Sequence, residues 1–176
     1  MHKPQHLQRG VTLIEAAIVM AVVAIAASTV APGFKSLVAR KRLEGVAAQL
    51  ATDLQGVRTE AVARNAPVRI SFHADANGSC YVIHTGAKAL CSCTGAPAVC
   101  TGEAVQLKAV YLPAAQQIAV NASAGSILFD PLHGTSTPSG TARVTGAQGA
   151  IHHVVNVMGR VRSCSPEGSV PGYRVC

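Results

Sequence analysis

Two arginines near the C terminus have the spacing of a phosphate-binding pair. They lie in the segment Gly159-Arg160-Val161-Arg162. In a strand, residues i and i+2 share a face, so Arg160 and Arg162 would point the same way, about 6.6–7 Å apart. This roughly matches the distance between successive phosphates of one nucleic-acid strand, and a guanidinium group can bind a phosphate through two hydrogen bonds. On these residues alone, the simpler interpretation is a solvated face that keeps an edge strand from aggregating.

The protein carries six cysteines, all beyond residue 79. An even number in one part of a chain predicts disulfides if that part reaches an oxidising compartment. Cys164 and Cys176 flank a segment rich in proline and glycine, and closing this loop would stabilise the fold by about 3 kcal/mol in the chain-entropy model. The same bridge would hold Arg162 beside Arg174, which predicts a cluster of three arginines.

The other four cysteines are Cys80, Cys91, Cys93 and Cys100. Once Cys164 is joined to Cys176 they allow three pairings, of which we favour Cys80–Cys91 with Cys93–Cys100. With His73 and His84 nearby, the four could also be interpreted as a zinc site. However, Cys-x-Cys is not a zinc-finger spacing, and oxidation is favoured outside the cytoplasm. We therefore predict disulfides, with no metal and no cofactor.

A single carboxylate stands near the start of a long apolar run. In the 22 residues from Val11 to Pro32, only Glu15 is ionisable, and this length suits a membrane span. A carboxylate costs roughly 3 kcal/mol at the centre of a span, so it needs a partner or a function. The leader upstream carries Lys3 and Arg9, which predicts a cytoplasmic leader and an exported C-terminal domain. An ordinary membrane anchor with a stray glutamate is the alternative.

The leader ending in Gly10, followed by Val11-Thr12-Leu13-Ile14-Glu15, resembles the type III signal of type IV pilins and pseudopilins. The resemblance implies that prepilin peptidase cleaves after Gly10 and that Val11 becomes the N-methylated amino terminus. It also implies that Glu15 neutralises the terminal amine of a neighbouring pilin during assembly. Val11 departs from the family pattern, in which phenylalanine, methionine or leucine is usual. The subunit would wait in the bacterial inner membrane, single-pass with a periplasmic domain, before it enters a pilus at the cell surface.

Together with this signal and a strand-rich domain, Gly159-Arg160-Val161-Arg162 resembles the FimT/GspH family of minor pilins and pseudopilins. In that family a strand leading into Gly-Arg-x-Arg recurs near the C terminus, and in FimT-type members it is associated with DNA binding. The resemblance implies that Gly159, Arg160 and Arg162 bind double-stranded DNA for uptake in natural transformation, and Arg174 would join them. Two alternatives bind no nucleic acid: a minor pilin that primes pilus assembly, and a pseudopilin of a type II secretion system.

Composition limits the other possibilities. The formal charge is +7, and removing Lys3 and Arg9 with the leader would leave 13 basic and 8 acidic residues, a charge of +5. This is a mild bias towards phosphate or acidic surfaces. The absence of tryptophan, with three phenylalanines and three tyrosines, argues against a base-stacking platform. The common catalytic and phosphate-loop motifs do not occur in the sequence, so we do not expect an enzyme.

The pattern of apolar residues predicts an α+β fold: a long N-terminal pilin helix packed on a β-rich, mainly antiparallel two-sheet domain. The helix would have a transmembrane half, residues 11–33, after the leader of residues 1–10, and an amphipathic half, residues 34–66. Its apolar stripe comprises Leu43, Val46, Leu50, Leu54, Val57 and Ala61, which step by three or four residues. Short alternating segments then predict strands over residues 67–176, ending in a hairpin between residues 160–164 and 173–176.

Overall fold

The computed structural model describes residues 11–94 and 97–176 of the chain, and of residues 29–32 only the backbone. The predicted leader, with Gly10, lies outside the described residues. The chain divides into two units, the first ending at Val38 and the second running from Ala39 to Cys176. The second unit holds the strands that the structure describes, and it carries the candidate site.

One helix, α1 (Leu13–Arg64), accounts for 52 residues. By length and composition it can cross a membrane, through an apolar stretch near the N terminus with a mean hydropathy of 2.3. Large side chains of the first unit, among them Ile14, Val19 and Ile25, are more than half exposed. An apolar surface of this extent needs lipid or neighbouring helices around it.

The part of α1 that belongs to the second unit, from Ala39 onwards, has one buried face. The fully buried residues are Leu43, Ala47, Leu50, Leu54, Val57 and Ala61. This confirms the predicted stripe except at Val46, which is only partly buried, because Ala47 faces the core instead. The helix ends where Asn65 takes a left-handed backbone conformation, with φ of 48°, a common way for a helix to stop.

Two larger sheets and one short ribbon follow, and all their pairings are antiparallel. The five-stranded sheet has the order β5-β2-β1-β7-β8, made of Gln106–Pro113, Gly78–Thr85, Val68–Asp75, Ser126–Phe129 and Ser136–Thr137. The four-stranded sheet has the order β11-β10-β9-β6, made of Val161–Cys164, Gly149–Val155, Gly140–Gly146 and Ile118–Ala122. The ribbon pairs β3 (Cys91–Ser92) with β4 (Val99–Cys100).

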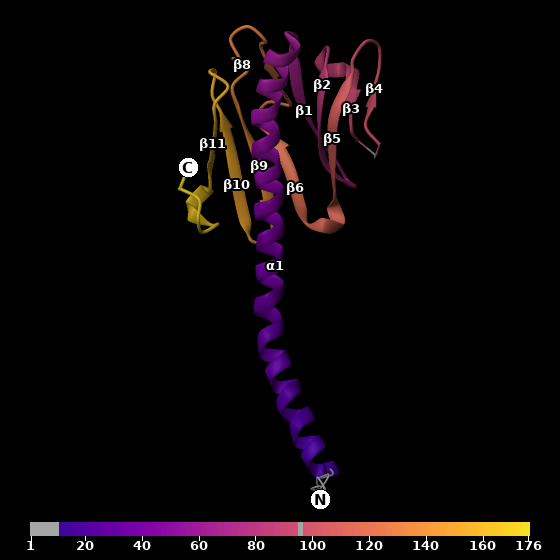
Figure 1. Cartoon of the computed structure of the whole chain (residues 1–176), viewed down its shortest axis with the longest axis vertical. Coiled ribbons are helices and arrows are strands. Elements are labelled where there is room, and N and C mark those ends of the chain that lie inside the picture. The colour runs from indigo at the N-terminus through magenta and orange to yellow at the C-terminus, as the bar shows by residue number, and fades with distance from the viewer. Residues whose placement is uncertain (1–10, 95–96) are drawn as a thin grey trace, which may run out of the picture. The chain divides into compact units, whose positions relative to one another are not determined.

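Within the second unit, α1 lies beside strands of both larger sheets (Figure 1). The three share one core, because Leu54 of α1, Ile70 of β1 and Ile151 of β10 belong to the same cluster of buried side chains. The predicted α+β fold, with a long helix on antiparallel sheets, is therefore confirmed. The short β3–β4 ribbon is an addition that the sequence pattern did not predict.

A buried carboxylate ties α1 to the five-stranded sheet. Asp53 is only 8% exposed. Tyr81 of β2 donates its hydroxyl hydrogen to Asp53 Oδ2 at 2.7 Å, and Lys108 Nζ of β5 lies 2.7 Å from Oδ1. Gln49, one turn earlier in α1, also donates to Oδ1. Burial, together with the hydrogen bond to Asp53, raises the pKa of Tyr81, so this hydroxyl stays protonated and acts as a donor.

The structure pairs all six cysteines. It joins Cys164 to Cys176 across a separation of 12 residues, the pairing that the sequence predicts. The other predicted pairings, Cys80–Cys91 and Cys93–Cys100, are wrong, because the structure joins Cys80 to Cys93 and Cys91 to Cys100. The physical reason is the register of the ribbon: Cys91 and Cys100 lie directly opposite each other in β3 and β4, with Cα atoms 4.1 Å apart.

The predicted C-terminal hairpin is also wrong. Strand β11 pairs with β10, and residues 173–176 form no strand beside it. They make a single parallel bridge, between Ser165 and Val175. The hairpin that contains the two predicted phosphate-binding arginines is therefore β10–β11, with its turn at residues 156–160.

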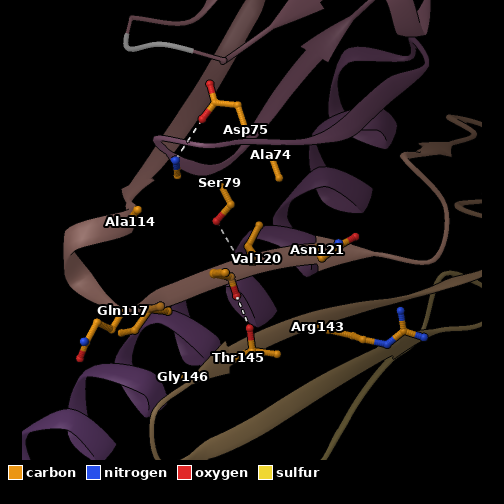
Figure 2. A pocket seen from close by; sticks show the side chains of 13 residues that line it. Ala74, Asp75, Ser79, Ala114, Gln117, Val120, Asn121, Arg143, Thr145 and Gly146 are labelled. Carbon is orange, nitrogen blue, oxygen red and sulfur yellow. Dashed lines mark hydrogen bonds between the residues drawn. The ribbon is translucent and has the colours of Figure 1, made fainter.

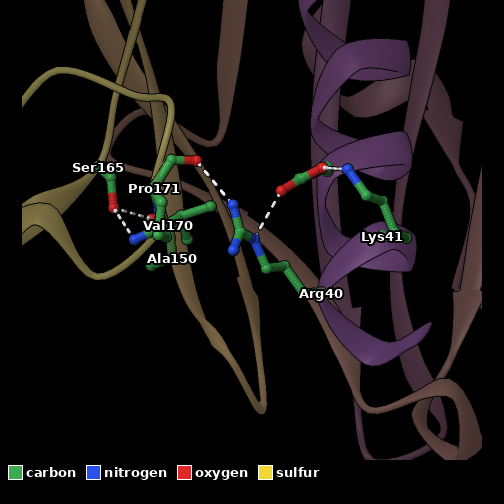
Figure 3. A network of polar contacts seen from close by, with 7 residues as sticks. Arg40, Lys41, Ala150, Ser165, Val170 and Pro171 are labelled. Atoms are coloured by element: carbon green, nitrogen blue, oxygen red, sulfur yellow. Dashed lines mark hydrogen bonds and ion pairs between the residues drawn. The ribbon is translucent and has the colours of Figure 1, made fainter. Parts of the chain in front are cut away.

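A serine and an arginine hold the segment that follows β11 (Figure 3). The buried Ser165 hydroxyl donates to the carbonyl of Ala150 and accepts from the amide of Val170, whose side chain is fully buried. Arg40 of α1 donates to the carbonyl of Pro171 at 3.0 Å and pairs with Glu44 of its own helix. These contacts fix the C-terminal segment against α1 and β10.

His153 of β10 is buried against α1. It is 1% exposed and shares a hydrogen bond with Ser163 Oγ at 2.8 Å through Nδ1. Its Nε2 is buried and has no hydrogen bond of good geometry among the described residues. Burial lowers the pKa of His153 to about 4, so the folded protein holds this ring neutral at pH 7.

This buried histidine predicts a loss of stability in weak acid. Between pH 6.5 and 5 the unfolded chain binds a proton at His153 that the folded chain does not, so the free energy of unfolding falls as the pH falls. From this group we expect a loss of about 1.5 kcal/mol over that interval. Urea unfolding at both pH values would measure it, with His153→Gln as the non-titrating comparison. An equal pH dependence in both proteins would contradict the prediction.

Candidate nucleic-acid interface

The turn between β10 and β11 presents Arg160 and Arg162. The amide of Gly159 donates to the carbonyl of Asn156 at 2.8 Å, which closes a tight turn. The Asn156 side chain accepts from the amide of Arg160 at 2.9 Å, and the Asn156 amide donates to the Arg160 carbonyl at 3.1 Å. Arg160 is therefore held at the base of the turn, one residue before β11 begins.

A neighbouring loop braces this turn from the other sheet. Ser136 of β8 donates its amide hydrogen to the carbonyl of Val157 at 2.9 Å and its hydroxyl hydrogen to the carbonyl of Asn156 at 2.6 Å. The loop is shaped by Asp130, whose Oδ1 accepts from the amides of His133 and Leu132. These hydrogen bonds, that of His133 first, lower the pKa of Asp130, so its carboxylate is charged and committed to the loop.

Gly159 lets the braced loop approach the turn. Its φ is +69°, a conformation that side chains disfavour. A β-carbon at this position would lie 2.4 Å from the carbonyl oxygen of Gly134 and 3.3 Å from Cδ of Arg58. The glycine of the Gly-Arg-x-Arg segment is buried, so its place in the structure is explained by this close packing.

A groove on the surface brings a third arginine to the same place. Its volume is about 440 Å³. It lies between α1 and the β10–β11 turn, and its lining residues are Gln55, Arg58, Thr59, Gly159, Arg160, Val161 and Arg162. We call it the basic groove. The sequence pattern did not assign Arg58 to the site, because it stands about 100 positions before the motif. Its only signal was a positive charge on the helix beside the apolar stripe, where it is half-buried.

Arg162 borders two surfaces. It lies opposite Val154 in the register of β10 and β11, so its side chain starts from the outer face of the four-stranded sheet, away from α1. Because β11 is the edge strand of this sheet, Arg162 also lines the basic groove. The prediction that Arg160 and Arg162 lie together is consistent with this groove, although Arg160 lies just outside the strand.

Arg174 does not join them in the groove. Its carbonyl accepts from the amide of Ser165 at 2.8 Å, which places it beyond the far end of β11. It does not line the basic groove. The basic groove therefore does not contain the predicted trio of Arg160, Arg162 and Arg174, because the disulfide-linked segment folds back beside Ser165. Arg58 of α1 takes the third position.

The basic groove carries positive charge without a carboxylate to balance it. Among the described residues, no carboxylate lies within ion-pair distance of Arg58, Arg160 or Arg162. The acidic groups nearest in sequence to Arg58 are engaged elsewhere: Asp53 with Lys108, and Glu60 with Arg64. The strands β6, β9, β10 and β11 of the four-stranded sheet contain no aspartate or glutamate. Such a cluster can bind an anion with several charges.

A larger cavity than the basic groove lies elsewhere, between the β1–β2 turn and strands β6 and β9 (Figure 2). It has a volume of about 600 Å³. Its serine, Ser79, accepts a hydrogen bond from the amide of Val120, and its carboxylate, Asp75, accepts from the amides of Asn77 and Gly78. No cysteine or histidine lines it. Nor do the described residues contain a group of three potential metal ligands.

The predicted assembly residues lie at the start of α1. Val11 precedes the helix and is exposed, and Glu15 stands in its first turn. The amide of Glu15 donates to Thr12 Oγ1 at 3.3 Å, the hydrogen bond of a helix cap. Within the described residues the Glu15 side chain has no ion-pair partner, so it is open to a group from another molecule.

Comparison with known proteins agrees with this architecture. Residues 46–159 match the family described as type II transport protein GspH, and residues 5–31 match the prokaryotic N-terminal methylation motif. Two crystal structures of the type IV minor pilin FimU from Pseudomonas aeruginosa PAO1 share the fold, with TM-scores of 0.55 and 0.51 at 18% and 16% sequence identity. These alignments cover 76% and 74% of this chain, and 96% and 98% of FimU. No curated protein sequence matches the chain.

Proposed function

This chain belongs to the GspH family of minor pilins and pseudopilins, and we propose that it is a minor type IV pilin that binds double-stranded DNA for uptake in natural transformation. The basic groove is the binding site, with Arg160 and Arg162 on the phosphates of the duplex. The observation that carries the proposal is that these arginines share one groove and have no carboxylate partner among the described residues.

The first half of α1 would anchor the subunit in the membrane and then incorporate it into a filament. We propose that prepilin peptidase cleaves after Gly10, that Val11 is then N-methylated, and that Glu15 pairs with the terminal amine of a neighbouring pilin. The apolar first unit holds the subunit in the inner membrane, with the second unit in the periplasm. On assembly, that helix packs among the helices of other pilins, and the second unit is displayed on the pilus surface.

The arginines suit sequence-independent binding. Contacts to phosphates position a protein on DNA but carry no base information. No aromatic residue lines the basic groove, so it provides no platform for stacked bases. A subunit with two or three such contacts binds weakly by itself, and neighbouring subunits in a filament raise the affinity through avidity.

DNA binding by the full chain in a non-ionic detergent tests the proposal. Fluorescence anisotropy with a labelled duplex, between 50 and 200 mM salt, should give a logarithmic slope of about −2 to −3. Arg160→Gln/Arg162→Gln should remove most of this slope and reduce binding at 50 mM salt to the level of empty micelles. The control is Arg42→Gln/Lys88→Gln, which removes two exposed cations outside the groove and should leave the affinity within about twofold.

Wild-type protein that fails to bind at 50 mM salt and high micromolar concentration would overturn the DNA proposal. The second candidate, a structural minor pilin or a type II secretion pseudopilin, would then hold. One observation favours this second candidate: the region that matches the GspH family ends at residue 159, before Arg160 and Arg162.

A further inference from the structure

We propose that Arg58, in the helix α1, is a third phosphate-binding residue of this site. A backbone phosphate of the DNA would then be held between the helix and the β10–β11 turn, and not by the Gly-Arg-x-Arg segment alone. This inference rests on the proposed function. It adds a residue that lies outside the Gly-Arg-x-Arg motif. The site is then formed by α1 and the β10–β11 turn, which are far apart in the chain.

Arg58 is fixed in the groove by its own packing. It lines the groove together with Arg160 and Arg162. A β-carbon on Gly134 would lie 2.7 Å from Arg58 Nε, and one on Gly159 would lie 3.4 Å from the same atom. The Arg58 side chain thus passes over Gly134 and Gly159, and any larger residue at either position would displace it. Its position is therefore set before a ligand binds.

The surroundings of Arg58 favour an anion. Three guanidinium groups in one groove repel each other, and in the described part of the chain no carboxylate relieves this repulsion. A phosphate does so, because each guanidinium can donate two hydrogen bonds to it. Gln55, three residues before Arg58, also lines the groove and adds a neutral donor at its rim. The Thr59 hydroxyl donates to the backbone carbonyl of Gln55.

Two substitutions separate phosphate binding from packing. Arg58→Met keeps an unbranched side chain over the two glycines but removes the charge, whereas Arg58→Lys keeps the charge. If Arg58 contacts a phosphate, Arg58→Met should reduce the salt slope by about 0.9 and weaken binding roughly fivefold at 50 mM salt. Arg58→Lys should keep the slope. Arg42→Met, the same change on an exposed part of the same helix, should leave both quantities unchanged.

The measurements are duplex anisotropy titrations of the full chain in non-ionic detergent, with the thermal unfolding midpoint of each variant as a check on folding. Arg58→Met with wild-type slope and affinity, beside an Arg160→Gln/Arg162→Gln variant that has lost binding, would overturn the role of Arg58 and leave the proposed function intact. A loss of affinity in Arg58→Met without a change in slope would also overturn it, because it would show that Arg58 only supports the turn. A wild type that does not bind DNA would overturn both proposals.

Discussion

Replacing Asp53 with alanine is expected to lower the free energy of unfolding by about 3 kcal/mol. Asp53 accepts hydrogen bonds from Tyr81 and Gln49 and pairs with Lys108. Alanine would leave the Tyr81 hydroxyl, in a side chain only 1% exposed, without an acceptor, which costs about 1–3 kcal/mol. The Lys108 side chain is 41% exposed and can turn to solvent when Asp53 is removed. Loss of this ion pair therefore lowers the free energy of unfolding by less than loss of a fully buried pair would.

Urea unfolding of a double-mutant cycle tests this account. Tyr81→Phe removes the donor but leaves the carboxylate with Lys108 and Gln49, so we expect a loss of about 1–2 kcal/mol. The double variant Asp53→Ala/Tyr81→Phe should be no less stable than Asp53→Ala alone, because the unpaired hydroxyl has been removed as well. Additive losses would show that the two side chains act independently, and the predicted network would be wrong.

Replacing Gly159 with alanine is expected to disrupt the site more than any other single change there. The residue would have to hold φ at +69°, which costs about 1–2 kcal/mol for an L-residue. Its β-carbon would also meet the Gly134 carbonyl oxygen at 2.4 Å, which no real structure tolerates. The turn must therefore move away from the loop that braces it. We expect a loss of at least about 3 kcal/mol in unfolding free energy, and DNA affinity reduced by at least tenfold.

Gly168 offers a matched control for the backbone strain. Its φ is +65° and the nearest atom to an added β-carbon is Val175 Cγ2 at 3.7 Å, an ordinary contact. Gly168→Ala should therefore cost only the strain, about 1–2 kcal/mol, and leave DNA binding unchanged. Urea unfolding and duplex anisotropy on the two variants give both comparisons. Equal stability losses would show that the contact with Gly134 is unimportant, and unchanged DNA binding in Gly159→Ala would separate the turn from the site.

Local features of the chain were predicted well from the sequence. The stripe from Leu43 to Ala61, with the exception of Val46, and the end of the helix near Asn65 lie where short-range patterns place them. The Cys164–Cys176 bridge belongs to the same group, since its ends are 12 residues apart and the intervening chain turns back on itself. Each of these features depends on neighbours within a few turns or one loop.

Long-range neighbours were not predictable in the same way. The choice between Cys91 and Cys93 as the partner of Cys80 depends on how β3 aligns with β4, and two cysteines one residue apart give no local reason to prefer either. The place of Arg174 depends on Ser165 and Val170, which hold the C-terminal segment against α1 and β10. The spacing of the cysteines and arginines along the chain contains neither fact.

The sequence by itself therefore determined the helix, the strand-rich domain, the processing signal and the pair Arg160 and Arg162, because periodicity and short motifs are properties of residues close together in the chain. Only the tertiary structure decided that Arg58 would replace Arg174 as the third arginine, and that Gly159 would serve to admit the Gly134 loop. These outcomes depend on which surfaces pack together once the helix and both sheets share a core. Such packing is the sum of many distant contacts, and no short segment of the chain contains it.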